Sequence, residues 1–288
     1  MDTLHPASGP VDRTIVVNRV AEHQWHALDD DRVAGRGNAV RRPDGRLFVS
    51  VDAWHEAVFR RLASALLADL PRPLYTVVDE TDIDQTAGWL LAGFSIGRRE
   101  RGYLVPTDPA DTGLVSADLA STRLADIGPA GTATAVPVPV PPPAGVTIIP
   151  AGSADGHRLR LLDRAIRDEI GATVGWQTMP AEVIALPPGV TVPDPSKYAV
   201  AAQGSEYVGM LRLATATRQP RIGLLAVRAD HRRRGIARAL LAHTLTTLHA
   251  RGTRAAWAEI TEANTAALAL FEAAGARHAA TNLELVRR

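Results

Sequence analysis

Three consecutive arginines, Arg232, Arg233 and Arg234, stand directly before Gly235 and a long apolar-striped stretch in the segment VRADHRRRGIARALLAHTL, residues 227–245. The first amides of a helix have no partner within the helix, and the helix dipole adds partial positive charge there. Arginine guanidinium groups supply charged donors whose geometry suits phosphate oxygens. Glycine allows the backbone to approach a ligand closely. The segment is therefore typical of a site for a phosphate-bearing ligand.

Two classes of ligand fit that chemistry, a phosphorylated cofactor and a nucleic acid. The chain carries 32 basic and 31 acidic residues, a formal net charge of +1, whereas a protein that wraps DNA usually has a larger positive excess. The apolar stripe of residues 236–251 indicates a helix that faces a core, and no helix-turn-helix partner precedes it. We therefore expect a phosphorylated cofactor and no nucleic-acid partner, with a DNA-binding module as the alternative from a different class.

The elements around the arginines alternate between strand and helix. Hydrophobic periodicity predicts a helix at 155–170, an irregular segment at 171–189, a hairpin at 198–215 that turns at GSE, a strand at 221–227, a helix at 236–252, a strand at 255–261, a helix at 264–275 and a strand at 282–288. This order is typical of an α/β (α+β) layer structure with a mixed sheet.

The first half of the chain repeats part of this order. It predicts strands at 46–51, 73–80 and 101–106 with helices at 56–70 and 84–93, and aligning Gly93 with Gly275 brings the two short helices into register. Five prolines between 137 and 143 favour an extended, semi-rigid connection between the halves. We interpret the chain as a divergent duplication with domains at 13–127 and 147–288, joined by a proline-rich linker at 128–146.

Arg232, Gly235 and Ala237 match the acyl-CoA-binding motif of the GNAT acyltransferase superfamily, which is Arg or Gln, two residues, Gly, one residue, then Gly or Ala. The segment AEITEANTAALALFEAAGA, which contains Asn264, also resembles that family, and the resemblance covers about residues 150–288. It implies two tandem GNAT-like domains, each a mixed, mostly antiparallel sheet flanked by helices, with acetyl-CoA as cosubstrate and no metal. The first domain is expected to be degenerate, because its helix starts with Asp52 and Glu56 instead of glycine and arginines.

The resemblance also implies roles for individual residues. Pantetheine would lie along the strand that ends at Val227, and backbone donors near Ala226 and Val227 would polarise the thioester carbonyl. Pyrophosphate would lie on the amides of residues 233–238. The expected cofactor-binding residues are Ala226, Val227, Arg232, Arg233, Arg234, Gly235, Ile236, Ala237, Arg238, Asn264 and Phe271. Family members often carry a tyrosine proton donor at the position of Phe271, so no general acid is assigned.

Catalytic and acceptor-binding residues are expected in addition to those that bind acetyl-CoA. Glu259 is the candidate general base, because its strand lies next to the expected coenzyme strand; a solvated strand carboxylate is the alternative. Asp168 and Glu169 lie at the end of the helix predicted at 155–170 and could hold a cationic acceptor. Glu169 is also the second candidate catalytic residue. The alternative for both is a plain charged helix end. Trp176 is a candidate wall of the acceptor pocket.

These residues predict an acetyl-CoA-dependent N-acetyltransferase that acts on a primary amine of a small molecule. Tandem chains of this kind resemble mycothiol synthase and antibiotic acetyltransferases such as those acting on capreomycin. The alternatives are acetylation of a peptide or protein N-terminus and a non-catalytic sensor of acyl-CoA. The chain has no cysteine, so the acetyl group cannot pass through a cysteine nucleophile. Without a signal-peptide pattern or a stretch of 18 apolar residues, we expect a cytoplasmic monomer or homodimer with no membrane partner.

Overall fold

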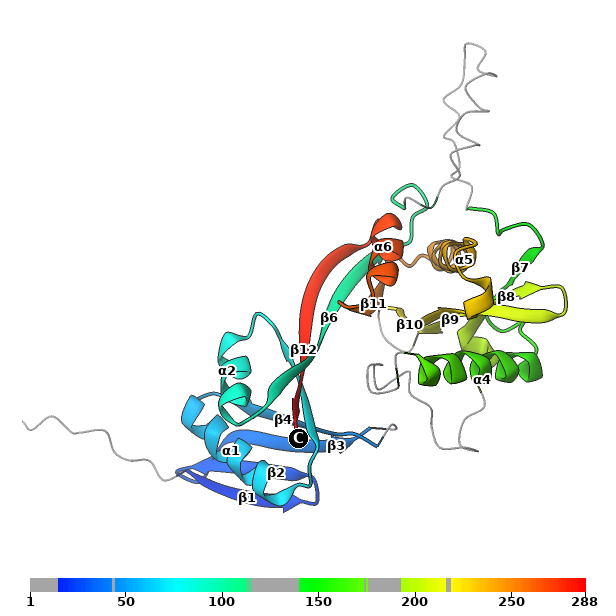
Figure 1. The fold of residues 1–288 in the computed structure, drawn as a ribbon. Coiled ribbons are helices and arrows are strands. Elements are labelled where there is room, and N and C mark those ends of the chain that lie inside the picture. Colours follow the sequence, from blue (N-terminus) through cyan, green and yellow to red (C-terminus); the bar gives the residue numbers. More distant parts are fainter. Residues whose placement is uncertain are drawn as a thin grey trace, which may run out of the picture. The chain divides into compact units, whose positions relative to one another are not determined.

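The computed structural model of the chain describes residues 15–42, 45–112, 114, 140–173, 175, 193–215 and 219–288. Contacts divide the chain into two compact units (Figure 1): a first unit of residues 1–97 with 283–288, and a second unit of residues 98–282. Residues 128–139 of the expected linker and most of the segment expected to be irregular lie outside the described residues.

The second unit contains the sheet that carries the arginine-rich segment. Its strand order is β12-β6-β11-β10-β9-β8-β7. Neighbouring strands from β7 to β10 pair antiparallel, β10 and β11 pair parallel, and β11 and β6 pair antiparallel. The strands are β6 (Ser95–Pro106), β7 (Val146–Ile149), β8 (Tyr198–Gln203), β9 (Glu206–Ala214), β10 (Arg221–Val227), β11 (Ala255–Thr261) and β12 (Arg277–Arg287). The mixed, mostly antiparallel sheet predicted from the sequence is confirmed, as is the hairpin that turns at Gly204.

Helices cover both faces of this sheet (Figure 1). Helix α4 (Gly156–Ala172) lies on one face, whereas α5 (Ile236–Ala250) and α6 (Thr265–Ala273) lie on the other. Strand β8 shows how the sequence directs this, because Ala199 and Ala201 pack into the cluster with α5, while Tyr198 and Val200 pack into the cluster with α4. The alternation follows from the two-residue period of a strand.

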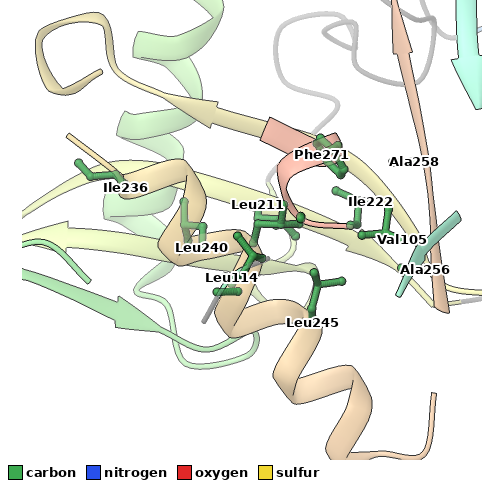
Figure 2. Close-up of a cluster of buried hydrophobic side chains, with 14 of the residues drawn as sticks. Val105, Leu114, Leu211, Ile222, Ile236, Leu240, Leu245, Ala256, Ala258 and Phe271 are labelled. Atoms are coloured by element: carbon green, nitrogen blue, oxygen red, sulfur yellow. The ribbon is translucent and has the colours of Figure 1, made fainter. Parts of the chain in front are cut away.

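Helix α5 is fixed to the sheet by apolar residues at helical spacing. Ile236, Leu240 and Leu245 are buried, and Figure 2 shows them in one cluster with Leu211 and Ile222 of the sheet. Burying a side chain of this size contributes about 1.5–3 kcal/mol. The apolar residues of α5, which speak against a DNA-reading helix, therefore pack into the core. The start of α5 remains at the surface.

The first unit contains the first four elements that the sequence predicted for this half, with three additional strands before them, whereas the strand predicted at 101–106 lies in the part of β6 that belongs to the second unit. Its strand order is β1-β2-β3-β4-β5-β12, with β4 and β5 parallel. The elements are β1 (Val16–Ala21), β2 (Gln24–Asp29), β3 (Arg32–Arg41), β4 (Leu47–Ala53), α1 (Glu56–Asp69), β5 (Leu74–Asp79) and α2 (Ile83–Leu91). Both helices pack on the core of this unit, which includes Leu62, Leu66 and Trp89. No helix among the described residues is both long and apolar enough to span a membrane.

The last strand contributes to both units. The expected second domain ran unbroken to residue 288, but contacts assign Leu283–Arg288 to the first unit and the preceding part of β12 to the second. Leu283 and Leu285, two residues apart and so on one face of the strand, are buried in the core of the first unit. The first unit therefore depends on the end of the chain for its core.

Leu285→Ala is expected to lower the free energy of unfolding by about 2–5 kcal/mol, because it leaves a cavity in the core of the first unit. Urea titration followed by the fluorescence of the buried Trp25 and Trp89 measures this change. Leu91→Ala is the matched control, since Leu91 is 82% exposed and should change stability by less than about 0.5 kcal/mol. Equal effects of the two substitutions would contradict the placement of Leu285.

Candidate active site

A cleft opens where β10 and β11 separate. Within the described length of these strands, parallel pairing is confined to Arg221 with Trp257 and Ile222 with Ala258. On its other edge, β10 shifts register against β9 between Ile222 and Leu224, which places a bulge at Gly223. A cavity of about 450 Å³ lies beyond this point, bordered by β10, β11, α6 and the start of α5. The separated strands therefore leave space for a ligand next to the backbone of β10.

The loop at the mouth of the cleft, residues 228–235, has the backbone geometry of an anion site; we call it the phosphate loop. Arg233 and Gly235 have positive φ angles of 63° and 84°, and Gly235 directly precedes α5 with no side-chain cap on the first amides of the helix. Successive amides in turns of this kind form anion-binding concavities. A Cβ added at Gly235 would meet only Pro143 Cγ at 3.7 Å, so the left-handed backbone, rather than crowding, requires glycine here.

The arginines of the loop have different surroundings. Arg232 donates from Nε to the Val227 carbonyl at 3.0 Å and from Nη2 to Glu169 Oε2 at 2.8 Å. Arg232, Arg233 and Arg238 border the cavity, and Arg234 is exposed. Arg232 is thus oriented by protein acceptors, whereas the cavity edge carries two further guanidinium side chains.

Glu259 lines the cavity just past the last paired position of β11. Its carboxylate accepts from Arg221 Nη2 at 2.5 Å and from Trp257 Nε1 at 3.1 Å. The side chain is 20% exposed, while the neighbours on the opposite face of the strand, Ala258 and Ile260, are buried in the core. Successive side chains of β11 thus alternate between the cavity and the core, and two neighbours fix the orientation of the carboxylate.

Helix α6 forms the remaining wall. Asn264 caps this helix, with Oδ1 accepting from the Ala267 amide at 3.1 Å. Phe271 is buried at the cavity wall and has no proton to donate. Both residues border the cavity, as the resemblance implied.

The arrangement agrees with the comparisons to known proteins. The family model of the GNAT acetyltransferases matches residues 165–276, which include the phosphate loop, Glu259 and α6. We call residues 165–276 the GNAT domain, after the family that they match.

Two solved structures share the fold of nearly the whole chain. A GCN5-related N-acetyltransferase from Sphaerobacter thermophilus superposes with a TM-score of 0.62 at 16% identity, covering 94% of this chain and 82% of that one. A tandem GNAT protein from the clavulanic acid biosynthesis pathway superposes with a TM-score of 0.56 at 14% identity, covering 92% and 82%. The tandem GNAT fold predicted from the sequence is confirmed.

A curated relative matches over a short stretch. The ribosomal protein bS18-alanine N-acetyltransferase of Escherichia coli K12 is 43% identical over 51 residues, which are 18% of this chain and 34% of that enzyme. The matched stretch spans about a third of the length of that relative.

The GNAT domain brings most of the expected site residues to one cleft. Val227, Ile236 and Ala237 line it together with the residues described above. Ala226 instead packs beside the cluster under α4, because successive side chains of β10 alternate between faces. Asp168 is exposed on α4, and Trp176 lies outside the described residues.

One residue of the cleft was missed by sequence reasoning. His231 borders the cavity, and its Nδ1 lies 2.7 Å from Asp230 Oδ1. The hydrogen bond with His231, together with nearby Arg228, holds the pKa of Asp230 below its usual range. In the sequence, His231 is marked only by its position beside the arginines, and its contact with Asp230 depends on the one-turn helix at Ala229–His231.

The first unit does not repeat the phosphate loop. His55 precedes α1 with an extended backbone, φ −137° and ψ 142°, where the GNAT domain has left-handed Gly235. Asp82 caps α2 as Asn264 caps α6, so these two helices correspond. Phe59 packs so closely against Gly88 that an added Cβ there would lie 2.6 Å from its ring, and it contacts Trp89 edge to face. Aromatic packing thus joins the two helices in the unit that lacks the loop.

Gly235→Glu is expected to abolish coenzyme A binding, because it adds a carboxylate and a strained left-handed side chain at the anion site. Isothermal calorimetry should give one site per wild-type chain and none in the variant. Gly252→Glu is the matched control: Gly252 ends the same helix with φ 79° and open space around it. Both substitutions should cost about 1–2 kcal/mol of stability through the left-handed backbone, yet only Gly235→Glu should lose the ligand. Normal binding by Gly235→Glu, or two equivalent sites in the wild type, would contradict the assignment.

Proposed function

We propose that the chain is an acetyl-CoA-dependent N-acetyltransferase that acts on a primary amine of a small molecule. The observation that carries the proposal is the combination of two features in one GNAT domain: β10 and β11 separate into a cleft, and the left-handed phosphate loop lies at its mouth. The first feature suits an extended, partly polar chain, and the second suits a pyrophosphate.

The residues present fit acetyl-CoA. The amides at the start of α5 and the guanidinium groups of Arg233 and Arg238 would hold the phosphates, and apolar walls such as Leu225 and Leu270 would contact the pantetheine. The backbone of β10 past Ile222 would supply amide and carbonyl partners along the cleft. Acetyl-CoA supplies the acetyl group in activated form, as a thioester.

Glu259 is proposed to accept the proton of the acceptor ammonium, directly or through a water, because only a neutral amine has a lone pair for attack. Arg221 and Trp257 hold the carboxylate at the cavity wall, so its orientation needs no adjustment when the acceptor binds. Phe271 provides no proton, and the leaving thiolate is proposed to take one from solvent. Transfer is proposed to be direct, and the lack of cysteine excludes a cysteinyl intermediate.

The acceptor is proposed to be a small amine, and an amine-bearing antibiotic is the class to test first. Support comes from fold similarity to the tandem GNAT protein of the clavulanic acid biosynthesis pathway. The second candidate is the N-terminus of a protein or peptide, which the similarity over 51 residues to the ribosomal protein bS18-alanine N-acetyltransferase favours.

Release of free coenzyme A thiol from acetyl-CoA, measured with a panel of amine antibiotics and N-terminal peptides, tests the proposal. A thiol-reactive dye reports this without background, because the protein has no cysteine of its own. The expected result is thiol release together with a mass gain of one acetyl group on an antibiotic or other small amine. Acetylated peptides alone would select the second candidate, and binding of acetyl-CoA without turnover on any acceptor would identify a sensor.

Glu259→Gln is expected to lower kcat by about 10²-fold or more at neutral pH, because the acceptor ammonium then lacks its proton acceptor. The affinity for acetyl-CoA should stay nearly unchanged, and activity should recover partly at high pH as free amine becomes available. Steady-state kinetics across pH measures all three effects.

Glu262→Gln is the control for that experiment. Glu262 is a nearby carboxylate that pairs with Arg99 and Arg101 and does not line the cavity among the described residues. Its loss should leave kcat within about twofold. An unaltered kcat in Glu259→Gln would reject Glu259 as the base, and a loss confined to the acceptor KM would make it a binding residue.

A further inference from the structure

A carboxylate from α4 contacts the phosphate loop at two points. Both Glu169 oxygens lie 3.0 Å from the Ala229 amide nitrogen, and Oε2 also accepts from Arg232 Nη2 at 2.8 Å. We infer that Glu169 is a positioning residue that holds the phosphate loop in its anion-binding shape through the Ala229 amide and Arg232. We call these three groups the Glu169 clamp. The inference rests on the proposed function only in naming coenzyme A as the ligand of the loop.

The clamp fixes the loop at its start. Ala229 directly follows Arg228, whose amide donates to the Val208 carbonyl of β9 at 3.0 Å. The next amide donates to Glu169, so two successive peptide groups are fixed, one by the sheet and one by α4. Arg232 is likewise bound to both the sheet and α4, because its side chain donates to the Val227 carbonyl of β10 and to Glu169.

This fixation matters because of the next residue. Arg233 adopts a left-handed backbone that a side-chain-bearing residue rarely takes, and such a conformation persists only where its surroundings maintain it. Arg232 immediately precedes it and is held by two charge-assisted hydrogen bonds. The clamp therefore stabilises the turn that aims the loop amides at a ligand.

The clamp also implies different roles for the arginines. The charge of Arg232 is matched by Glu169, and its side chain is directed to protein acceptors. Arg232, Arg233 and Arg238 all border the cavity, and of these three Arg232 is the one held by the Glu169 clamp. The first arginine of the motif is thus assigned to the structure of the loop, and the charge offered to phosphate is assigned to the later ones.

The sign of one measurement separates positioning from simple electrostatics. A carboxylate near an anion site repels a polyanionic ligand, so removing Glu169 should strengthen binding of coenzyme A if charge alone matters. If Glu169 maintains the shape of the loop, its removal should weaken binding.

Calorimetric titration with coenzyme A, without acceptor, measures this for the wild type, Glu169→Ala and Asp168→Ala. We expect the dissociation constant to rise tenfold or more in Glu169→Ala. Asp168→Ala removes a carboxylate at the neighbouring, exposed position of the same helix and should stay within twofold of the wild type. Unchanged or tighter binding by Glu169→Ala would overturn the inference, as would an equal loss in Asp168→Ala.

The double variant tests the route through Arg232. Arg232→Ala should weaken binding to a similar extent, and Glu169→Ala with Arg232→Ala should be no worse than about twofold beyond either alone, because both remove one clamp. Additive losses would show that Arg232 contacts the phosphates directly and would reject the assigned division of roles.

A measurement without ligand keeps the clamp testable by itself. Amide hydrogen exchange over residues 228–233 should speed up at least tenfold in Glu169→Ala and stay unchanged in Asp168→Ala. Unchanged exchange in Glu169→Ala would refute the clamp. Failure of the wild type to bind coenzyme A would instead refute the proposed function, and hydrogen exchange would still decide the clamp. With an acceptor identified, the pH profile of kcat should keep its shape in Glu169→Ala, whereas loss of a general base would change it.

Discussion

The separation of two parallel strands after two paired positions is the constraint on which the site depends. β10 and β11 pair at Ile222 and diverge, with a bulge at Gly223 on the far edge of β10. The helix that connects parallel neighbours must start beyond the carboxyl end of the first strand. Here that start directly follows Gly235, so the uncapped end of α5 lies at the mouth of the gap. One topological requirement therefore brings an exposed strand backbone and an anion-binding helix end to the same cavity.

The first unit shows that the topology alone is insufficient. β4 and β5 also pair in parallel at two positions, Leu47 with Leu74 and Phe48 with Tyr75, and α1 connects them. The connection reaches α1 through the extended backbone of His55. The fold requires only that the chain cross over, whereas the phosphate loop additionally requires left-handed residues and groups that hold them. The first unit retains the crossover between parallel strands and lacks the left-handed loop.

Local pattern predicted the elements of the GNAT domain well. The strands expected at 221–227 and 255–261 coincide with β10 and β11, because their apolar residues alternate and glycines or polar turns bound them. The strands β1 to β3 were not predicted, since their sequences mix glycine, arginine and polar residues with few apolar ones. The division of β12 between the units could not be read from its sequence either. It depends on which core receives Leu283 and Leu285, and that is a long-range property.

The same limit applies to the site. The motif placed the phosphate loop, but Glu169 lies 60 positions before the Ala229 amide that it contacts, and no local signal distinguishes it from Asp168. Both carboxylates could be named from the sequence as members of a charged helix end. Only the packing of α4 across the sheet decides that one of them reaches the loop while the other stays exposed.

The two matched carboxylate–arginine pairs give the cleft a polarity along its length. Glu259 with Arg221 lies where β10 and β11 still pair, and Glu169 with Arg232 lies beyond the other end of β10. From Ile222 to Val227 an extended strand spans about 17 Å. The cationic side chains that border the cavity at the loop end are those of Arg232, Arg233 and Arg238. On the proposed function, a long ligand with phosphates at one end and a neutral, reactive group at the other is expected to bind in one direction, with its phosphates at the loop. Its reactive end then lies beside the only carboxylate among the described residues of the cavity wall, which is where an amine that must lose a proton would have to be.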